Sequence, residues 1–196
     1  MPATASRPGS VTDSTVVVFG DPVAAAAARH LALAPAASMQ ELAQAAGVSR
    51  ATLFRRFPSR AALVAELCRT AAEAFVSSVQ DAAPEEGSPP EALQRVVQAL
   101  GRLSAVVGLL GLQPLQENVE AALLARTATT EESLRQLVRR GQESGDFRVE
   151  VDPEWVLTML TWLLVGAADS VRLGRLTVGA AQRHLEATLT STLIRS

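Results

Sequence analysis

The chain contains no lysine and no tyrosine, and it has one cysteine and two histidines among its 196 residues. A single cysteine excludes an internal disulfide and fits a protein kept in a reducing compartment. His30 and His184 lie far apart in the chain, and neither has a serine, cysteine or acid at the spacing of a catalytic motif. The sequence also lacks a glycine-rich phosphate loop and a Cys/His metal pattern. It therefore predicts no enzyme, no catalytic residue, no metal site and no cofactor.

Long hydrophobic runs are scarce as well. The longest are residues 105–112 and 156–168, which are too short or too interrupted by threonine to be expected to cross a bilayer. The apolar stretch at 16–19 is too short for the core of a secretory signal, and the sequence gives no reason for it. We therefore expect a cytoplasmic protein.

The arginines are distributed unevenly. Residues 1–70 carry seven arginines against four acidic residues, and residues 71–196 carry eleven against sixteen. The formal charge of −2 thus combines a basic N-terminal part with an acidic remainder. This asymmetry is typical of a nucleic-acid reader attached to a separate regulatory body, although charges scattered over solvated faces could produce it too.

Residues 38–60 have the pattern of two short helices joined by a tight turn. Ser38 and Glu41 have the spacing of a capping box, and Gly47 can take the positive φ that ends the first helix. Ser49 is a second N-cap, and Pro58 stops the second helix.

The side chains of the second helix divide into two faces. Leu53 and Phe57 are four residues apart and face inward together, which leaves the arginines of this helix on the outside. The pattern predicts a helix-turn-helix with a basic outer face, a unit that lays its second helix in a DNA major groove.

The same stretch resembles the TetR family of bacterial transcription regulators. In that family the motif typically reads Ala-Gly-Val-Ser-x-x-Thr-Leu-Tyr-x-His-Phe-x-x-Lys, and here residues 46–60 read AGVSRATLFRRFPSR. Phe54 replaces the usual tyrosine, Arg56 the histidine and Arg60 the lysine. The resemblance covers residues 38–66, and the chain length also suits the family.

The resemblance implies an all-α fold with an N-terminal helix-turn-helix three-helix head and a C-terminal helical bundle that dimerises. We expect a flexible tail at 1–20, a DNA-binding domain at 21–66 and a ligand-binding and dimerisation domain at 67–196. The implied function is a repressor released from a palindromic operator by a small, mostly apolar effector. The alternative is a helical adaptor of the same fold that binds a small molecule or a protein but not DNA.

The resemblance also implies which residues contact double-stranded DNA. Gln40 and Arg50 are expected at base edges, since arginine suits guanine. The other predicted contacts are to the DNA backbone, from Ser38, Thr52, Arg55, Arg56 and Arg60. Phe54 is expected to pack on a sugar or touch a thymine methyl group.

Helical spacing continues to the end of the chain. We expect helices over 23–33, 60–82, 91–107, 109–124 with a break at Pro114, from Thr129 or Thr130 to 144, over 153–172 and over 178–194. The helix at 153–172 is apolar nearly all round, so it is expected to form a homodimer interface with the last helix, or else to be the central helix of a monomeric bundle.

The effector is expected inside the body. The candidate lining residues, which could equally be plain core residues, are Phe75, Val79, Leu100, Leu103, Trp155 and Trp162, with Gln116 or Asn118 as polar contacts. The lack of tyrosine and of histidine clusters favours a mostly apolar organic molecule.

Overall fold

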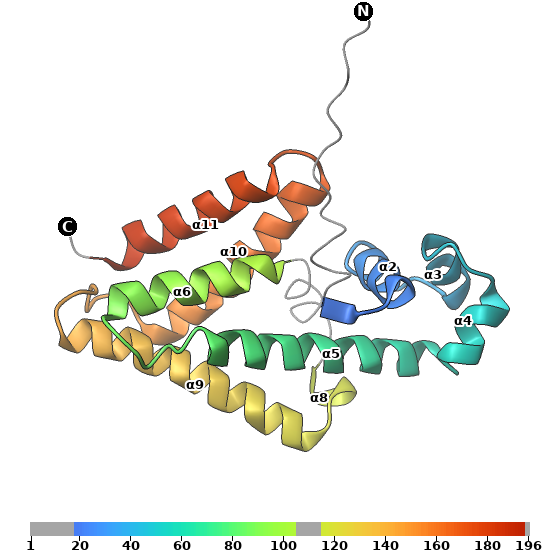
Figure 1. Ribbon diagram of the computed structural model, residues 1–196, viewed down its shortest axis with the longest axis horizontal. Coiled ribbons are helices and arrows are strands. Elements are labelled where there is room, and N and C mark those ends of the chain that lie inside the picture. The colour runs from blue at the N-terminus through green and yellow to red at the C-terminus, as the bar shows by residue number, and fades with distance from the viewer. Residues whose placement is uncertain (1–17, 105–114, 195–196) are drawn as a thin grey trace, which may run out of the picture.

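The computed structural model describes residues 18–104 and 115–194 of the chain. These residues form helices joined by short connections, with one isolated β-bridge, between Phe147 and Ile194. Figure 1 shows a small group of helices at one end of the long helix α5 and a larger group around its other end. The predicted all-α architecture, an N-terminal helix-turn-helix head followed by a helical bundle, is confirmed.

The head has three short helices, α2 (Pro22–Leu31), α3 (Met39–Ala45) and α4 (Arg50–Arg56). The carboxylate of Asp21 begins α2 by accepting the backbone N–H groups of Val23 at 3.1 Å and Ala24 at 2.9 Å. The buried face of α2 consists of Leu31 and four alanines, so neighbouring helices can approach it closely.

Helix α5 (Arg60–Asp81) joins the head to the body, in agreement with the helix predicted over 60–82. Two hydrophobic clusters meet along it. Val76 belongs to the cluster of the head, Val79 belongs to the cluster of the body, and Phe75 packs against both. The two parts therefore share α5, and the predicted boundary between residues 66 and 67 falls inside one continuous helix.

The short stretch before α2 also touches both clusters. Val18 packs against the cluster of the body and Phe19 against that of the head. These contacts give a reason for two apolar residues that the sequence left unexplained. Residues 18 and 19 are therefore packed against the protein, although they fall within the flexible tail predicted at 1–20. Residues 1–17 of that tail lie outside the described part of the chain.

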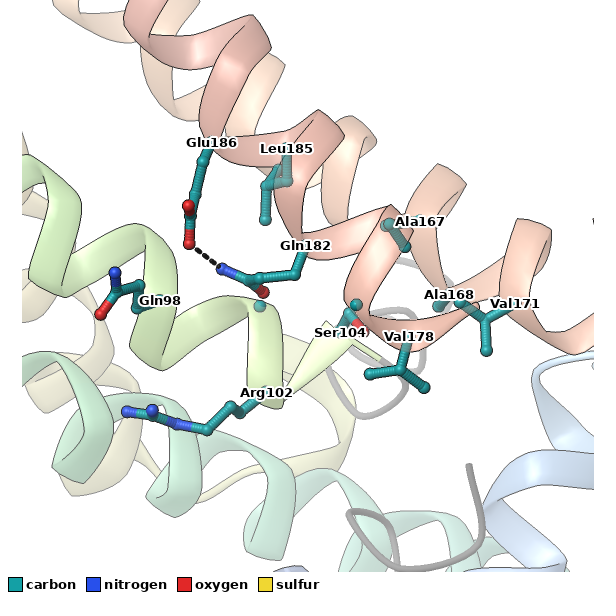
Figure 2. Close-up of a pocket in the computed structure, with 13 residues that line it drawn as sticks. Gln98, Arg102, Ser104, Ala167, Ala168, Val171, Val178, Gln182, Leu185 and Glu186 are labelled. Carbon is teal, nitrogen blue, oxygen red and sulfur yellow. Dashed lines mark hydrogen bonds between the residues drawn. The ribbon is translucent and has the colours of Figure 1, made fainter. Parts of the chain in front are cut away.

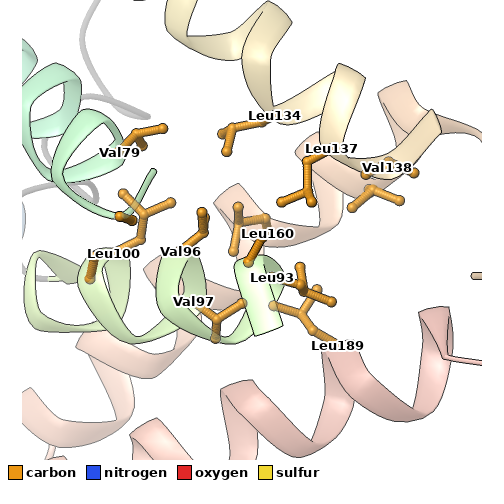
Figure 3. Packing of buried hydrophobic residues seen from close by; sticks show 14 of the residues in the cluster. Val79, Leu93, Val96, Val97, Leu100, Leu134, Leu137, Val138, Leu160 and Leu189 are labelled. Carbon is orange, nitrogen blue, oxygen red and sulfur yellow. The ribbon is translucent and has the colours of Figure 1, made fainter. Parts of the chain in front are cut away.

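The body is a bundle around one core. Its helices are α6 (Pro89–Arg102), α8 (Leu115–Asn118), α9 (Ala121–Glu143), α10 (Pro153–Arg172) and α11 (Val178–Leu193). Figure 3 shows side chains from several of these helices and from α5 pointing toward one another. Local residues end α9 and begin α10, since Gly145 has a φ of +81° after α9 and Asp152 caps α10.

The prediction that a helix opens at Thr129 or Thr130 is wrong. Helix α9 begins at Ala121, and both threonines lie inside it. Their hydroxyl groups donate to the carbonyls four residues earlier, at 3.0 Å for Thr129 and 2.9 Å for Thr130. A threonine can bond back along a helix instead of capping a new one, which is why the local pattern was ambiguous.

The prediction for α6 needs a smaller correction. This helix begins at Pro89, two residues before the predicted start, because Ser88 and Glu91 form a capping box that the sequence analysis missed. Residues 105–114, including the predicted break at Pro114, lie outside the described residues. The end of the helix predicted over 109–124 is divided between α8 and α9.

Helix α10 leaves two large aromatic side chains exposed. It buries Val156, Leu160 and Leu164, whereas Trp155 is 59% exposed and Trp162 is 61% exposed. With 20 residues it is long and apolar enough, by length and composition alone, to cross a membrane, contrary to the sequence expectation. The threonines do not interrupt it, because they bond back to the carbonyls four residues earlier.

Candidate DNA-binding surface

The turn between α3 and α4 has the geometry that its sequence predicts. Gly47 has a φ of +67°, in the left-handed region that glycine enters without steric cost. The next residue, Val48, donates its N–H to the carbonyl of Ala43 at 3.0 Å. Leu42 and Leu53 are fully buried, one on each helix. The turn therefore fixes α4 against α3 with its opposite face turned outward.

Serine caps begin both helices of the motif. The N–H of Ser38 donates to the carboxylate of Glu41 at 2.7 Å, and the N–H of Glu41 donates to the Ser38 hydroxyl at 3.3 Å. The bond from the Ser38 backbone, followed by that from its hydroxyl, lowers the pKa of Glu41 below its ordinary value of 4.5. Ser49 accepts the N–H of Thr52 at 3.1 Å, and the two hydroxyl oxygens lie 2.8 Å apart. Ser38 and Thr52 thus lie at the starts of the two helices.

The outer face of the motif is polar and basic. Gln40, Arg50 and Arg55 are exposed on α3 and α4. The guanidinium carbon of Arg50 lies 5.1 Å from the centre of the Phe54 ring, at cation–π distance. Phe54 itself is half-buried against the head cluster, so its ring supports Arg50 from inside.

Arg56 is paired within the head. Its two terminal nitrogens lie 3.0 Å and 2.7 Å from the two carboxylate oxygens of Asp21, the residue that also caps α2. The Arg56 side chain is 47% exposed, so the pair contributes at most about 1 kcal/mol to stability. It nevertheless ties the end of α4 to the start of α2.

Arg60 is turned toward the protein backbone. Its Nε donates to the carbonyl of Ala37 at 2.9 Å, and its Nη2 donates to the carbonyl of Pro35. These bonds hold the start of α5 against the segment between α2 and α3. The structure thus places Arg50 and Arg55 on the outer face, and it engages Arg56 and Arg60 inside the head.

The sequence alone does not reveal that Asp21, Pro35 and Ala37 are partners of these arginines. Asp21 and Arg56 are 35 residues apart, so no local spacing rule connects them. One signal was present, because both arginines depart from the family pattern. Arginine carries a planar fork of donors that can bind two acceptors at once, which lysine lacks.

The residues predicted to line an effector site do not share one cavity. Phe75 and Leu100 line a pocket of about 250 Å³ between α5, α6, α9 and α10. Val79 and Leu103 are buried in the core, while Trp155 and Trp162 point to the outside of α10. Asn118 lies in α8, and the side chain of Gln116 lies outside the described part.

The pocket at Phe75 has a charged rim. Arg135 lies within ion-pair distance of Glu131 at 3.5 Å and Glu132 at 3.6 Å, and it also binds Glu154. The hydrogen bond with Glu154 is the main reason that the pKa of Arg135 is raised above its ordinary value. The pocket therefore has an apolar interior, formed by Phe75 and leucines, and a rim whose charged residues pair with one another.

Comparison with known proteins places this geometry in a family. The family model described as "Bacterial regulatory proteins, tetR family" matches residues 25–67, which include α3, α4 and the turn between them. The HTH-type transcriptional regulator NfxB of Pseudomonas aeruginosa is 31% identical over 159 residues, which cover 78% of this chain and 82% of NfxB.

A second relative is known both by sequence and by structure. The HTH-type transcriptional repressor LfrR of Mycolicibacterium smegmatis is 29% identical over 133 residues, 68% of each chain. The crystal structure of LfrR in complex with proflavine aligns with a TM-score of 0.65 at 24% identity, covering 92% of this chain and 98% of LfrR. The head, the long α5 and the helical body are thus a known arrangement. The chain belongs to the TetR family of bacterial transcriptional regulators, and it is a DNA-binding regulator of transcription.

Proposed function

We propose that the protein is a cytoplasmic, homodimeric repressor that binds a palindromic operator and leaves it when a small organic effector binds the body. The observation that carries this proposal is the outer face of α4, where exposed arginines lie on a helix fixed by the buried Leu53. A helix fixed in this way can enter a major groove without first changing its own structure.

Within this proposal, base edges are read by Arg50 and Gln40. Arg50 has a guanidinium held close to α4 by Phe54, which limits the directions in which it can reach a guanine. Arg55 is exposed and free to bind a phosphate, since it has no ion pair among the described residues. Ser38 and Thr52 stand at the two helix starts, where backbone N–H groups also favour phosphate.

Arg56 and Arg60 have a different role in this proposal. Both engage acceptors within the head, so their first task is to hold α2, α4 and α5 together. Arg56, whose side chain is 47% exposed, can still exchange Asp21 for a phosphate, because the pair with Asp21 is weak. Arg60 is bound to two backbone carbonyls and acts on DNA mainly through the position of the head.

The exposed face of α10 supports the homodimer. Trp155 and Trp162 are seven residues apart, which places them on the same side of the helix, and both are more than half exposed. Large aromatic side chains dominate the energy of protein interfaces. A second copy placed on α10 and α11 would cover both tryptophans and present two copies of α4 to two half-sites of one operator.

The effector is proposed to occupy the pocket at Phe75. This pocket is lined by α5, which also carries the head, so a molecule that moves α5 changes the position of α4. The complex of LfrR with proflavine supports a small-molecule site in this fold. The relatives are regulators of transcription, and we propose that this chain likewise has no catalytic activity.

The test is selection of DNA fragments from a random pool with the purified protein. We expect enrichment of an inverted repeat, and removal of the Arg50 side chain by Arg50→Ala should relax the preferred base at one position of each half-site. Failure to enrich any sequence would favour the adaptor, which has the same fold but does not bind DNA. A compound that binds equally well with and without operator is not the effector, because coupling is reciprocal.

A further inference from the structure

A second cavity lies between the C-terminal half of α6 and the hairpin of α10 and α11 (Figure 2). Its volume is about 390 Å³, within the range of small-molecule sites. It shares no lining residue with the pocket at Phe75, so the two are separate sites.

The cavity exists because one of its walls is built from small apolar side chains. Helix α10 contributes Ala167, Ala168 and Val171, and α11 contributes Gly179 and Ala181. None of the described residues that line it is aromatic. This wall gives an apolar surface against which the body of an organic molecule can pack.

Helix α11 also contributes a polar pair, Gln182 and Glu186, to the lining of the cavity. The amide nitrogen of Gln182 donates to Glu186 Oε1 at 2.8 Å and to the carbonyl of Val97 at 3.3 Å. The Gln182 amide lies directly against the backbone of α6 at Gly101, where a Cβ atom would overlap it. Glycine at this position therefore lets Gln182 reach α6 and hold the Glu186 carboxylate toward the cavity.

Glu186 has no ion-pair partner among the described residues. Its one hydrogen bond from a side chain comes from a neutral amide, whereas a carboxylate can accept about four. Arg102 also lines the cavity, but Figure 2 shows its guanidinium directed away from Glu186. The cavity thus combines an apolar wall with an oriented carboxylate that lacks a cation.

We propose that this cavity binds a small organic cation, an ammonium or amidinium group attached to an apolar body. The charged end lies on Glu186, and the apolar part lies on Ala167, Ala168 and Val171. Neither DNA binding nor the effector pocket at Phe75 is needed for this binding, so the site stands independently of the proposed regulation.

The test uses three probes of one shape and different charge, 4-phenylbutylamine, 4-phenylbutan-1-ol and 4-phenylbutyrate, titrated by calorimetry into the full-length protein at pH 7. We expect the amine to bind about tenfold or more tightly than the alcohol, and the butyrate to bind least, since a charge-assisted hydrogen bond is formed only by the amine. Tighter binding of the butyrate would assign the site to Arg102 and overturn the proposal.

Two variants locate the binding. Glu186→Gln keeps the hydrogen bond from Gln182 but removes the charge, so affinity for the amine should fall to that for the alcohol. Glu143→Gln is the matched control, because it removes one exposed carboxylate at the end of α9 and should change nothing. Equal affinity of Glu186→Gln and the unmodified protein for the amine would contradict the proposal.

The third variant, Ala168→Leu, fills the cavity from α10 and should abolish binding of the amine, with circular dichroism and sedimentation confirming an intact fold. Persistent binding would place the amine elsewhere in the body and overturn the assignment. DNA binding without any probe is measured on the same samples, so a failure of the proposed regulator role is seen separately.

Discussion

Helices α4 and α10 each fully bury only a few residues, but the large side chains that they expose are of opposite kinds. Helix α4 has seven residues, buries Leu53 and exposes arginines, whereas α10 has 20 residues, buries three and exposes two tryptophans. An exposed arginine is well solvated by water, whereas two large exposed tryptophans on one side of a helix are typical of an interaction surface. In our proposal, the exposed face of α4 contacts the DNA backbone, and the exposed face of α10 is covered by a second copy of the chain.

The largest expected effect is on dimerisation, from a substitution on the exposed face of α10. Trp162→Glu places a charge at the centre of the proposed dimer surface, twice in each dimer, and should weaken dimerisation at least about 100-fold. Sedimentation velocity at micromolar concentration should show a monomer that has lost affinity for an inverted repeat. Val149→Glu is the control, since Val149 is 62% exposed but lies outside α10 and α11. A Trp162→Glu protein that remains a dimer would place the interface elsewhere.

On α4, Arg50→Ala and Arg55→Ala should distinguish recognition of the base sequence from electrostatic attraction to the DNA backbone. Removal of the Arg50 side chain should cost about 1–3 kcal/mol on the preferred operator and less on other sequences. Removal of the Arg55 side chain should weaken binding to all sequences and flatten the salt dependence by about one unit for each phosphate that is no longer neutralised.

Fluorescence anisotropy on labelled duplexes at several salt concentrations measures both effects. The control is Arg148→Ala, which removes an exposed charge beyond the end of α9. If Arg55→Ala leaves the salt slope unchanged, α4 does not approach the DNA backbone as we propose.

A smaller effect is expected from Arg60→Lys, which keeps the charge and restores the residue usual in the family. Lysine cannot donate to the carbonyls of Pro35 and Ala37 with the geometry of a guanidinium, so the head should lose about 1–3 kcal/mol of stability. The salt slope of DNA binding should stay the same. Thermal unfolding measures the stability, and fluorescence anisotropy measures the salt dependence of DNA binding. A changed salt dependence with unchanged stability would show that Arg60 contacts a phosphate.

The smallest effect concerns pH. The pKa of Glu41 is lower in the folded head than its ordinary value of 4.5, so its stabilising effect is present above that value and is lost as pH falls through the folded pKa. Glu41→Gln should therefore lower the melting temperature slightly at pH 7, and this difference should become smaller as the pH is lowered through the folded pKa of Glu41. A difference that does not change with pH would show that the charge of Glu41 does not support the cap.

These results follow a simple division between what the sequence could and could not predict. The caps and turn of the motif, Ser38 with Glu41, Gly47 and Ser49, were correctly predicted, because each involves residues within a few positions of one another. The pair between Arg56 and Asp21 was not, since it forms only after α2 and α4 have packed.

In the body, the orientation of a whole helix likewise depends on contacts between distant residues. The apolar pattern of α10 does not specify which side faces the core, so the outward direction of Trp155 and Trp162 could not be predicted. Phe147 is another example, because its ring fits against α9 at Gly141, where any Cβ atom would overlap it. Nothing in the local sequence around Gly141 distinguishes this contact from an ordinary helical glycine.

The central claim is that two copies of α4, held by the α10 and α11 surfaces, read two half-sites on one side of the DNA. The most direct measurement compares the affinity for the selected inverted repeat with that for the same repeat carrying about five additional base pairs at its centre. About half a helical turn is inserted, so one half-site rotates to the opposite side of the duplex. We predict that affinity falls to that of a single half-site. Equal affinity for both DNAs would contradict the claim.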